Sequence, residues 1–355
     1  MNEQKVFIGT YTSKLPFVVG KAEGIYVCSL NMDSGKLTYL SHTKGPPNPS
    51  YLAIEPQKRY IFSVEETVEE ENPQIHALRI NGNRLNFINS IPAGGGLPCH
   101  INVDQSGQYV FCANYETGSV ACFSIESNGS IKERISLIQH HGSGSKHPRQ
   151  LGPHAHAAVL NSDNLLLFVP DLGLDKILIY NFDPATGNLT PHVPPYAKTH
   201  PGAGPRHLVF HPSQDYAFLL NEMDATIIVY EYLSGYFNPI QTISTLPNDC
   251  SSDPSCAEIA VTPNGRFVYA SNRGHNSLAR FFFQSGQLIA LGYTPTMGDT
   301  PRDFSIDNTG TFLLVGNQDS HTVVTYRINY KNGNLEETGH IIEIPNPVCI
   351  LPVIL

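Results

Sequence analysis

The stretch Gly204-Pro205-Arg206-His207-Leu208-Val209-Phe210-His211-Pro212 decides the fold of this chain, together with Asn221-Glu222, which closes it. Apolar and other residues alternate through the first half, a turn tetrad follows, and apolar residues then return up to Leu220. Alternation on both sides of a tight turn predicts two antiparallel strands. The stretch therefore predicts a β-hairpin whose open end brings together a guanidinium, an imidazole and a carboxylate.

Copies of this hairpin pattern recur along the chain at a period of roughly 50 residues, which is typical of propeller blades. Further copies begin at Pro49, Pro98, His154, Cys256 and Pro301. In most copies two outer strands follow. One example is the apolar run 176–182, which is followed by the turn sequence Asp-Pro-Ala-Thr-Gly-Asn-Leu at 183–189. A similar turn sequence, Asn-Tyr-Lys-Asn-Gly-Asn-Leu, occupies 329–335.

The two ends of the chain supply a seventh copy. Residues 347–352 resemble a first strand with nothing after it, and residues 5–11 resemble a second strand with nothing before it. Pairing of these strands would close a ring and protect its edges. We therefore predict an all-β single domain over residues 1–355, a seven-bladed β-propeller with four-stranded antiparallel blades, closed by its N- and C-terminal strands. Because the chain has no tryptophan, blades with the WD dipeptide are excluded.

The net charge, the cysteines and the apolar runs of the sequence indicate which partners and which compartment to expect. The formal net charge of −9 argues against nucleic acid, which requires a basic face. The seven cysteines are scattered without a CxxC pair, which favours small buried residues in a reducing compartment. We find no apolar signal region after Met1 and no run of the roughly 18 apolar residues that a membrane span needs. We expect a cytoplasmic protein without nucleic-acid or membrane partners, as a monomer or weak homodimer.

Polar side chains recur at the open ends of the hairpins, where a core would be apolar. A hairpin midpoint at residue 214 predicts that Arg206 lies opposite Glu222, and the turn at Gly310 predicts Arg302 opposite Gln318. Aligned positions around the ring hold Tyr11, Glu66, His100, Tyr115, His156, Asp171, His207, Glu258, Arg273 and Asp303. We expect these residues to surround one mouth of the central channel, where converging polar groups indicate a site.

The residues by themselves leave several interpretations open. Polar side chains and water commonly fill propeller channels, yet three arginines at one mouth favour recognition of an anion. His154 and His156 are spaced to lie on one side of a strand, but without a third ligand a general base or hydrogen-bond donor is favoured over a metal site. The polar insertion Gln-His-His-Gly-Ser-Gly-Ser-Lys-His-Pro-Arg-Gln-Leu-Gly, at 139–152, fits either a loose loop or a flap over the channel.

Several motifs together resemble the seven-bladed propeller lactonase family, over essentially the whole chain and in order. They are Gly9-Thr10-Tyr11-Thr12, His156-Ala157-Ala158, Gly204-Pro205-Arg206-His207, Asn221-Glu222, Asn272-Arg273 and Pro301-Arg302. The resemblance implies a site at the channel mouth with His156, Arg206, Glu222 and Arg273 as catalytic residues. Arg302 and His207 lie nearby, and we expect substrate contacts from them, from His154 and from Gln318.

The family resemblance implies hydrolysis of a lactone, in the first place a phosphorylated sugar δ-lactone of the 6-phosphogluconolactone type. Water would attack the ring carbonyl, with His156 or Glu222 as base and an arginine at the oxyanion. We expect a small anionic sugar lactone as ligand, and no metal or other cofactor. Two alternatives remain: a lactonizing enzyme of the carboxymuconate type, and a non-catalytic propeller that binds a small anion or a protein partner.

Overall fold

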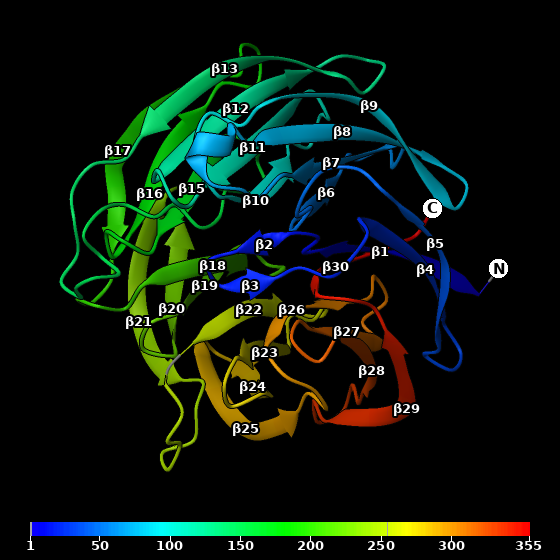
Figure 1. Cartoon of the computed structure of the whole chain (residues 1–355). Helices are drawn as coiled ribbons and strands as arrows, with labels where there is room; N and C mark the ends of the chain where they lie inside the picture. The colour runs from blue at the N-terminus through cyan, green and yellow to red at the C-terminus, as the bar shows by residue number, and fades with distance from the viewer. Residues whose placement is uncertain (1, 254) are drawn as a thin grey trace. The chain divides into compact units, whose positions relative to one another are not determined.

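The computed structural model describes residues 2–253 and 255–355, and nearly all of its regular structure is β-strand. Its strands form seven four-stranded antiparallel sheets and one two-stranded hairpin, β2-β3 (Figure 1). The sheets, in order of hydrogen-bonded strands, are β30-β1-β4-β5, β6-β7-β8-β9, β10-β11-β12-β13, β14-β15-β16-β17, β18-β19-β20-β21, β22-β23-β24-β25 and β26-β27-β28-β29. Seven such sheets are the blades of the predicted seven-bladed β-propeller.

The strand bounds follow the repeat. They are β1 (Glu3–Thr10), β2 (Lys14–Leu15), β3 (Val18–Val19), β4 (Ile25–Asn31), β5 (Leu37–Thr43), β6 (Leu52–Ile54), β7 (Tyr60–Val64), β8 (Gln74–Asn81), β9 (Arg84–Pro92), β10 (Pro98–Val103), β11 (Tyr109–Asn114), β12 (Ser119–Ile125), β13 (Ile131–Gln139), β14 (Val159–Leu160) and β15 (Leu166–Asp171). The second half contains β16 (Lys176–Phe182), β17 (Leu189–Lys198), β18 (Pro205–Phe210), β19 (Tyr216–Asn221), β20 (Thr226–Leu233), β21 (Tyr236–Ser244), β22 (Cys256–Val261), β23 (Phe267–Asn272), β24 (Ser277–Gln284), β25 (Gln287–Pro295), β26 (Pro301–Ile306), β27 (Phe312–Asn317), β28 (Thr322–Ile328), β29 (Leu335–Glu343) and β30 (Pro347–Val353). A short 3₁₀ turn, η1, covers Glu69–Glu71.

The described residues form two compact units. Unit 1 contains residues 2–42, 207–232 and 238–355, except residue 254, and it holds the sheets that begin with β30, β22 and β26 together with most of β18–β21. Unit 2 contains residues 43–206 and 233–237, and it holds the sheets of β6–β9, β10–β13 and β14–β17. Strand β18 carries Arg206 in unit 2 and His207 in unit 1.

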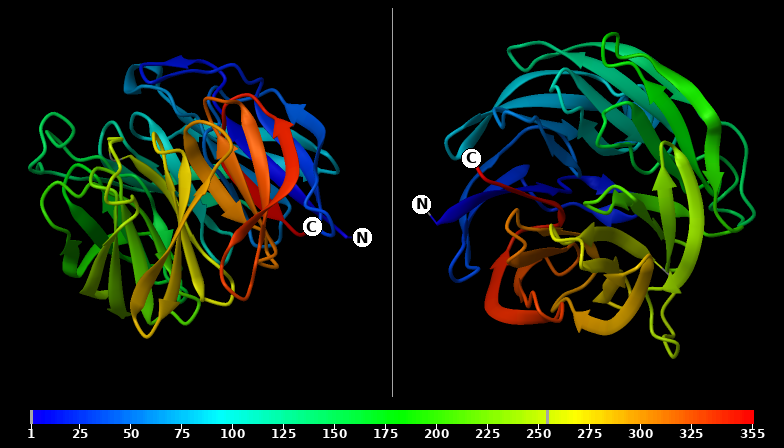
Figure 2. Two further views of the ribbon diagram at one scale, coloured as in Figure 1. Left: turned by 90° about the horizontal axis from the view of Figure 1, so that it is seen from below. Right: turned by 180° about the vertical axis from the view of Figure 1, so that it is seen from behind.

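The pairing of the two chain ends is confirmed within unit 1. Strand β30 runs antiparallel to β1, with Ile8 opposite Ile350 and Val6 opposite Pro352. In Figure 1 the red C-terminal strand lies beside the dark blue β1, and both views of Figure 2 show these two ends of the chain together. One blade is therefore built from both ends of the chain.

Aromatic and branched side chains form the cores between neighbouring sheets. In unit 2, Phe62 and Phe123 belong to a cluster that joins the β6–β9 and β10–β13 sheets. In unit 1, Phe218 and Phe281 belong to a similar cluster between the β18–β21 and β22–β25 sheets. A blade has two faces, and burial of both against neighbours supplies the hydrophobic stabilisation that a lone sheet lacks.

Two details of the expected strands are wrong. Strand β26 pairs Pro301 with Asn317 and Asp303 with Gly316, so Arg302 is the extra residue of a bulge and does not face Gln318 in the ladder. The His154–His156 segment is not a strand, because only an isolated bridge joins Ala155 to Asp171. The cross-strand pairs were predicted from the midpoint of each hairpin, which assumes a regular ladder. A bulge adds one residue to one strand and so shifts the pairing by one residue.

Candidate active site

An asparagine ends the second strand of most blades, and its side chain ties the turn that follows. Asn114 donates to Ser119 Oγ at 3.0 Å, and Asn221 donates to Thr226 Oγ1 at 2.9 Å. Asn272 and Asn317 donate to backbone carbonyls, those of Thr245 and Thr296. These amides fix the strand ends, and the next residue along the chain is Tyr115, Glu222, Arg273 or Gln318.

The β14–β17 sheet is shifted by one residue from the alignment expected from the sequence. The bridge of Ala155 to Asp171 corresponds to the pairing of Pro301 with Asn317, so Asp171 occupies the asparagine position. His156 therefore corresponds to Arg302, at the bulge, and not to Asp303, with which the sequence alignment matched it. The error arose because the segment before β14 lacks the proline that marks most of the other copies.

In unit 1, Glu222 and Arg273 form a largely buried ion pair. Arg273 Nη2 lies 3.1 Å from Glu222 Oε2, and the guanidinium also donates to the carbonyls of Ser255 and Cys256. Both residues directly follow the asparagine of their strands, as the aligned positions predicted. A guanidinium held by one carboxylate and two carbonyls has a fixed orientation and keeps its positive charge.

Three other predicted residues lie in the same unit. His207 Nδ1 contacts Glu258 Oε2 at 2.8 Å, and both side chains are buried. The Arg302 guanidinium lies over the ring of Tyr11, 5.4 Å from its centroid. Gln318 donates to Asp319 Oδ1 at 2.9 Å. We call Glu222, Arg273, His207, Glu258 and Arg302 the arginine cluster.

In unit 2, two predicted histidines pack on one tyrosine. The His154 ring stacks on Tyr115 with centroids 4.5 Å apart, and the His156 ring meets Tyr115 edge-on at 5.4 Å. His154 Nδ1 also donates to the Tyr115 carbonyl at 2.9 Å. Cys99 Sγ lies 3.8 Å from His156 Nδ1. We call His154, His156, Tyr115 and Cys99 the histidine cluster. Its two imidazoles share one neighbour, although the expected strand is absent.

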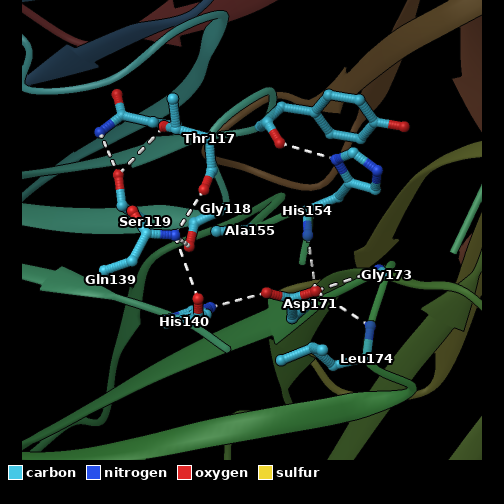
Figure 3. A network of polar contacts seen from close by, with 12 residues as sticks. Thr117, Gly118, Ser119, Gln139, His140, His154, Ala155, Asp171, Gly173 and Leu174 are labelled. Atoms are coloured by element: carbon cyan, nitrogen blue, oxygen red, sulfur yellow. Dashed lines mark hydrogen bonds and ion pairs between the residues drawn. The ribbon is translucent and has the colours of Figure 1, made fainter. Parts of the chain in front are cut away.

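A buried His140–Asp171 pair supports this segment (Figure 3). His140 Nδ1 donates to Asp171 Oδ2 at 2.6 Å, and Asp171 Oδ1 accepts the backbone N–H of His154 at 2.8 Å. The same oxygen accepts the N–H groups of Gly173 and Leu174. Burial and the negative charge of Asp171 raise the pKa of the neighbouring Tyr180 phenol. Sequence reasoning missed the role of His140, because nothing in its own neighbourhood indicates a partner 31 residues away.

Arg206 is almost completely buried within strand β18. Its contact with Glu222 remains a prediction. Within the acidic segment 65–71, Glu69–Glu71 are exposed, but Glu66 is buried. The backbone N–H of Glu66 donates to the carbonyl of Asn48, so this part of the segment packs against the start of its own blade.

The described part of the chain shows neither a grouped set of metal ligands nor a disulfide. Among residues 2–253 and 255–355, no three His, Cys, Asp or Glu side chains are grouped as a metal would require. None of the seven cysteines, all within the described ranges, is in a disulfide. No helix in these ranges has the length and apolar character needed to cross a membrane.

Comparison with known proteins places this chain in a family. The family described as "Lactonase, 7-bladed beta-propeller" matches residues 5–352. The chain is 33% identical to a 6-phosphogluconolactonase of Bacillus subtilis over 97% of both chains. It is 34% identical to a 6-phosphogluconolactonase of Formosa agariphila over 94% of both. The solved structure of a periplasmic gluconolactonase of Pseudomonas aeruginosa superposes with a TM-score of 0.92, at 29% identity over 99% of each chain. The chain belongs to the seven-bladed β-propeller lactonases.

Proposed function

We propose that this protein hydrolyses a sugar-acid δ-lactone, with 6-phosphogluconolactone as its substrate. The observation that carries the proposal is the full-length similarity to two proteins named 6-phosphogluconolactonase. The arginine cluster supports it, because it supplies two guanidinium groups, those of Arg273 and Arg302, in a chain whose formal net charge is −9, and guanidinium groups suit anionic ligands. Glu222 offsets part of that charge.

In this mechanism His156 is the general base. It removes a proton from water as the oxygen attacks the lactone carbonyl, a contribution of typically about 10²–10⁴-fold in rate. Glu222 is assigned a different role because its Oε2 is already in contact with Arg273. Glu222 thus orients Arg273, which donates to the developing oxyanion. The ring C–O bond then breaks, and the proton taken by His156 returns to the leaving alkoxide, giving the open sugar acid.

Arg206 serves as a second donor to the oxygen of the lactone carbonyl. His207 and Arg302 contact the remaining substrate oxygens, and His154 and Gln318 complete the binding groups. A cytoplasmic location is part of the proposal, supported by seven cysteines outside disulfides, which suits a reducing compartment.

The test measures loss of freshly generated 6-phosphogluconolactone against its spontaneous hydrolysis. We expect acceleration by the protein and a fall in kcat of about 10²–10⁴-fold in His156→Asn. The matched control is His192→Asn, on the outer strand β17, where the ring contacts the Asn181 amide. No acceleration by the wild-type protein rejects the function. A His156→Asn variant with normal kcat rejects only the identity of the base.

A further inference from the structure

Gln150 anchors the insertion at 139–152 to the turn between β15 and β16. Gln150 is almost fully buried, and its Oε1 accepts the N–H groups of Ser145 and Lys146 at 3.0 and 2.8 Å. Its Nε2 donates to the Leu172 carbonyl at 2.8 Å and to Asp175 Oδ1 at 2.7 Å. One amide therefore organises the loop internally and attaches it to the segment that follows β15.

Asp175 also binds the segment that leads into β18. Asp175 Oδ2 accepts the N–H of Gly202 at 2.7 Å, and its Oδ1 accepts the N–H of Gly204 at 3.0 Å. Gly204 is two residues before Arg206, one of the proposed catalytic residues. Asp175 therefore fixes the insertion and the approach to Arg206 relative to each other, through contacts that all lie within unit 2.

Arg149 is held by this loop at the edge of the histidine cluster. Its Nη2 donates to the Tyr115 hydroxyl at 3.0 Å. The ring of the same tyrosine contacts His154 by stacking and His156 edge-on. Tyr115 therefore contacts the Arg149 guanidinium through its hydroxyl and His156, the proposed general base, through its ring.

The charge of the loop is distinctive for this chain. The whole protein has a formal net charge of −9, yet residues 139–152 contain Lys146, Arg149 and several histidines without a single carboxylate. Clustered cations on an acidic protein indicate a local anion site. Arginine suits phosphate best, since its planar guanidinium forms forked contacts with phosphate oxygens.

We propose that Arg149, on the docked 139–152 loop, recognises the phosphate of the substrate and so selects phosphorylated over unphosphorylated sugar lactones. This inference rests on the proposed lactonase function and adds its specificity. In a sugar δ-lactone the carbonyl carbon and the carbon that bears the phosphate arm both flank the ring oxygen. The phosphate arm is therefore close to the reacting carbonyl, so a cation that binds it must lie near the base, and Arg149 and His156 both contact Tyr115.

The experiment compares 6-phosphogluconolactone with glucono-δ-lactone as substrates of the wild type and of Arg149→Ala. We expect kcat/KM for the phosphorylated lactone to fall roughly 10- to 100-fold, mainly through KM, as expected for removal of a charged hydrogen bond. For the unphosphorylated lactone we expect a change within about 2-fold, because the phosphate is the only substrate group that this proposal places at the Arg149 guanidinium. Arg149→Lys keeps a cation and should restore part of the preference.

The matched control is Lys132→Ala, which removes one positive charge from the outer strand β13 of the same unit. It should leave both substrates unchanged. An equal fall for both lactones in Arg149→Ala overturns the proposal, because it indicates a structural or general catalytic role. An unchanged preference overturns it as well.

A binding measurement separates this inference from the function on which it rests. Calorimetry with 6-phosphogluconate and gluconate reports phosphate recognition without any turnover. If the wild type hydrolyses neither lactone but binds 6-phosphogluconate more tightly than gluconate, and Arg149→Ala removes the difference, the phosphate site stands and the lactonase function fails. Equal affinities of wild type and Arg149→Ala for 6-phosphogluconate overturn the phosphate site.

Discussion

At the scale of single residues, Glu222 and Arg273 form a largely buried ion pair, which in the proposed mechanism orients the guanidinium before the substrate binds. The carboxylate at 3.1 Å and two backbone carbonyls hold the guanidinium, so its orientation does not depend on the substrate. Preorganised donors stabilise a developing charge without reorganisation during the reaction. In the proposed mechanism, the free energy needed to bury and orient the ion pair is therefore spent when the protein folds, before the substrate binds.

Replacing Glu222 by Gln tests this arrangement, since glutamine keeps the shape of the side chain and removes its charge. We expect kcat/KM to fall by about 10- to 100-fold, equivalent to about 1.4–2.8 kcal/mol in transition-state binding. Steady-state kinetics measure it, with Glu231→Gln as the control, because Glu231 is an exposed residue of β20 that contacts Asn238. A Glu222→Gln enzyme with unchanged kcat/KM would contradict the assigned role.

His211, at the tip of the β18–β19 hairpin, gives stability a dependence on pH. Burial lowers its pKa, although the Gly265 carbonyl and Asp215 act in the opposite direction. Because the folded-state pKa lies below the unfolded value of about 6.5, the unfolded chain binds more protons below that pH. The contribution of His211 is therefore complete above about pH 6.5 and is lost as the pH falls through the folded pKa.

Between pH 7.5 and pH 5, we expect the free energy of unfolding to fall more for the wild type than for His211→Gln. These two pH values lie roughly one unit or more on either side of the unfolded-state pKa. Urea unfolding at several pH values measures both proteins. Comparison at pH 7.5 isolates the stability that the neutral ring supplies, including its hydrogen bond from Nε2 to the Gly265 carbonyl. Parallel pH curves for the two proteins would show that His211 does not titrate as inferred.

At the scale of elements, each inner hairpin is held by a side chain at its tip. Asp104 accepts the N–H groups of Ser106, Gln108 and Tyr109 at 2.8–2.9 Å, and Asp307 makes the same set of contacts in the β26–β27 hairpin. Such local bonds favour a turn over any continued strand. They help to fix the point at which each strand reverses.

Asp104→Ala should lower the free energy of unfolding by about 1–3 kcal/mol, because buried backbone donors lose their acceptor. Denaturant unfolding provides the measurement. Asp183→Ala serves as the comparison: it removes an exposed turn aspartate between β16 and β17, and we expect a clearly smaller loss. Equal losses in the two variants would argue against burial as the source of the effect.

At the scale of the whole molecule, one blade depends on strands from both ends of the chain. Ile350 of β30 is buried opposite Ile8 of β1, and it shares a core cluster with Phe312 and Leu314. The backbone N–H of Ile350 also donates to Asp303 Oδ2. These contacts join the last strand to β1 and to the neighbouring sheet, and they remove an unpaired edge.

Ile350→Ala should destabilise the protein by about 2–5 kcal/mol, the usual range for truncating a buried isoleucine. Ile354→Ala is the matched control, since Ile354 lies four residues further on and is exposed, so its effect should stay within about 0.5 kcal/mol. Both values come from denaturant midpoints. A similar midpoint for the two variants would mean that the closing strand contributes little to stability.

Much of the architecture could be predicted from local pattern. Strand β16 and the turns at 183–189 and 329–335 occur where the sequence indicated, because alternation and turn residues are local signals. The pairing of β1 with β30 was predictable for another reason: each end of the chain carried half of a repeat. The positions of Glu222 and Arg273 followed from the same repeat.

The amino-acid sequence by itself determined the number of blades, the closing strand pair and the polar positions at the strand ends, since all of these repeat with the period of the hairpin. The tertiary structure alone decided which distant side chains meet. It pairs His140 with Asp171, Arg149 with Tyr115 and Gln150 with Asp175. It also places Arg302 in a bulge, where a regular ladder was expected. These contacts depend on how an irregular insertion packs and where a ladder shifts register, and neither is encoded in a residue's immediate neighbours.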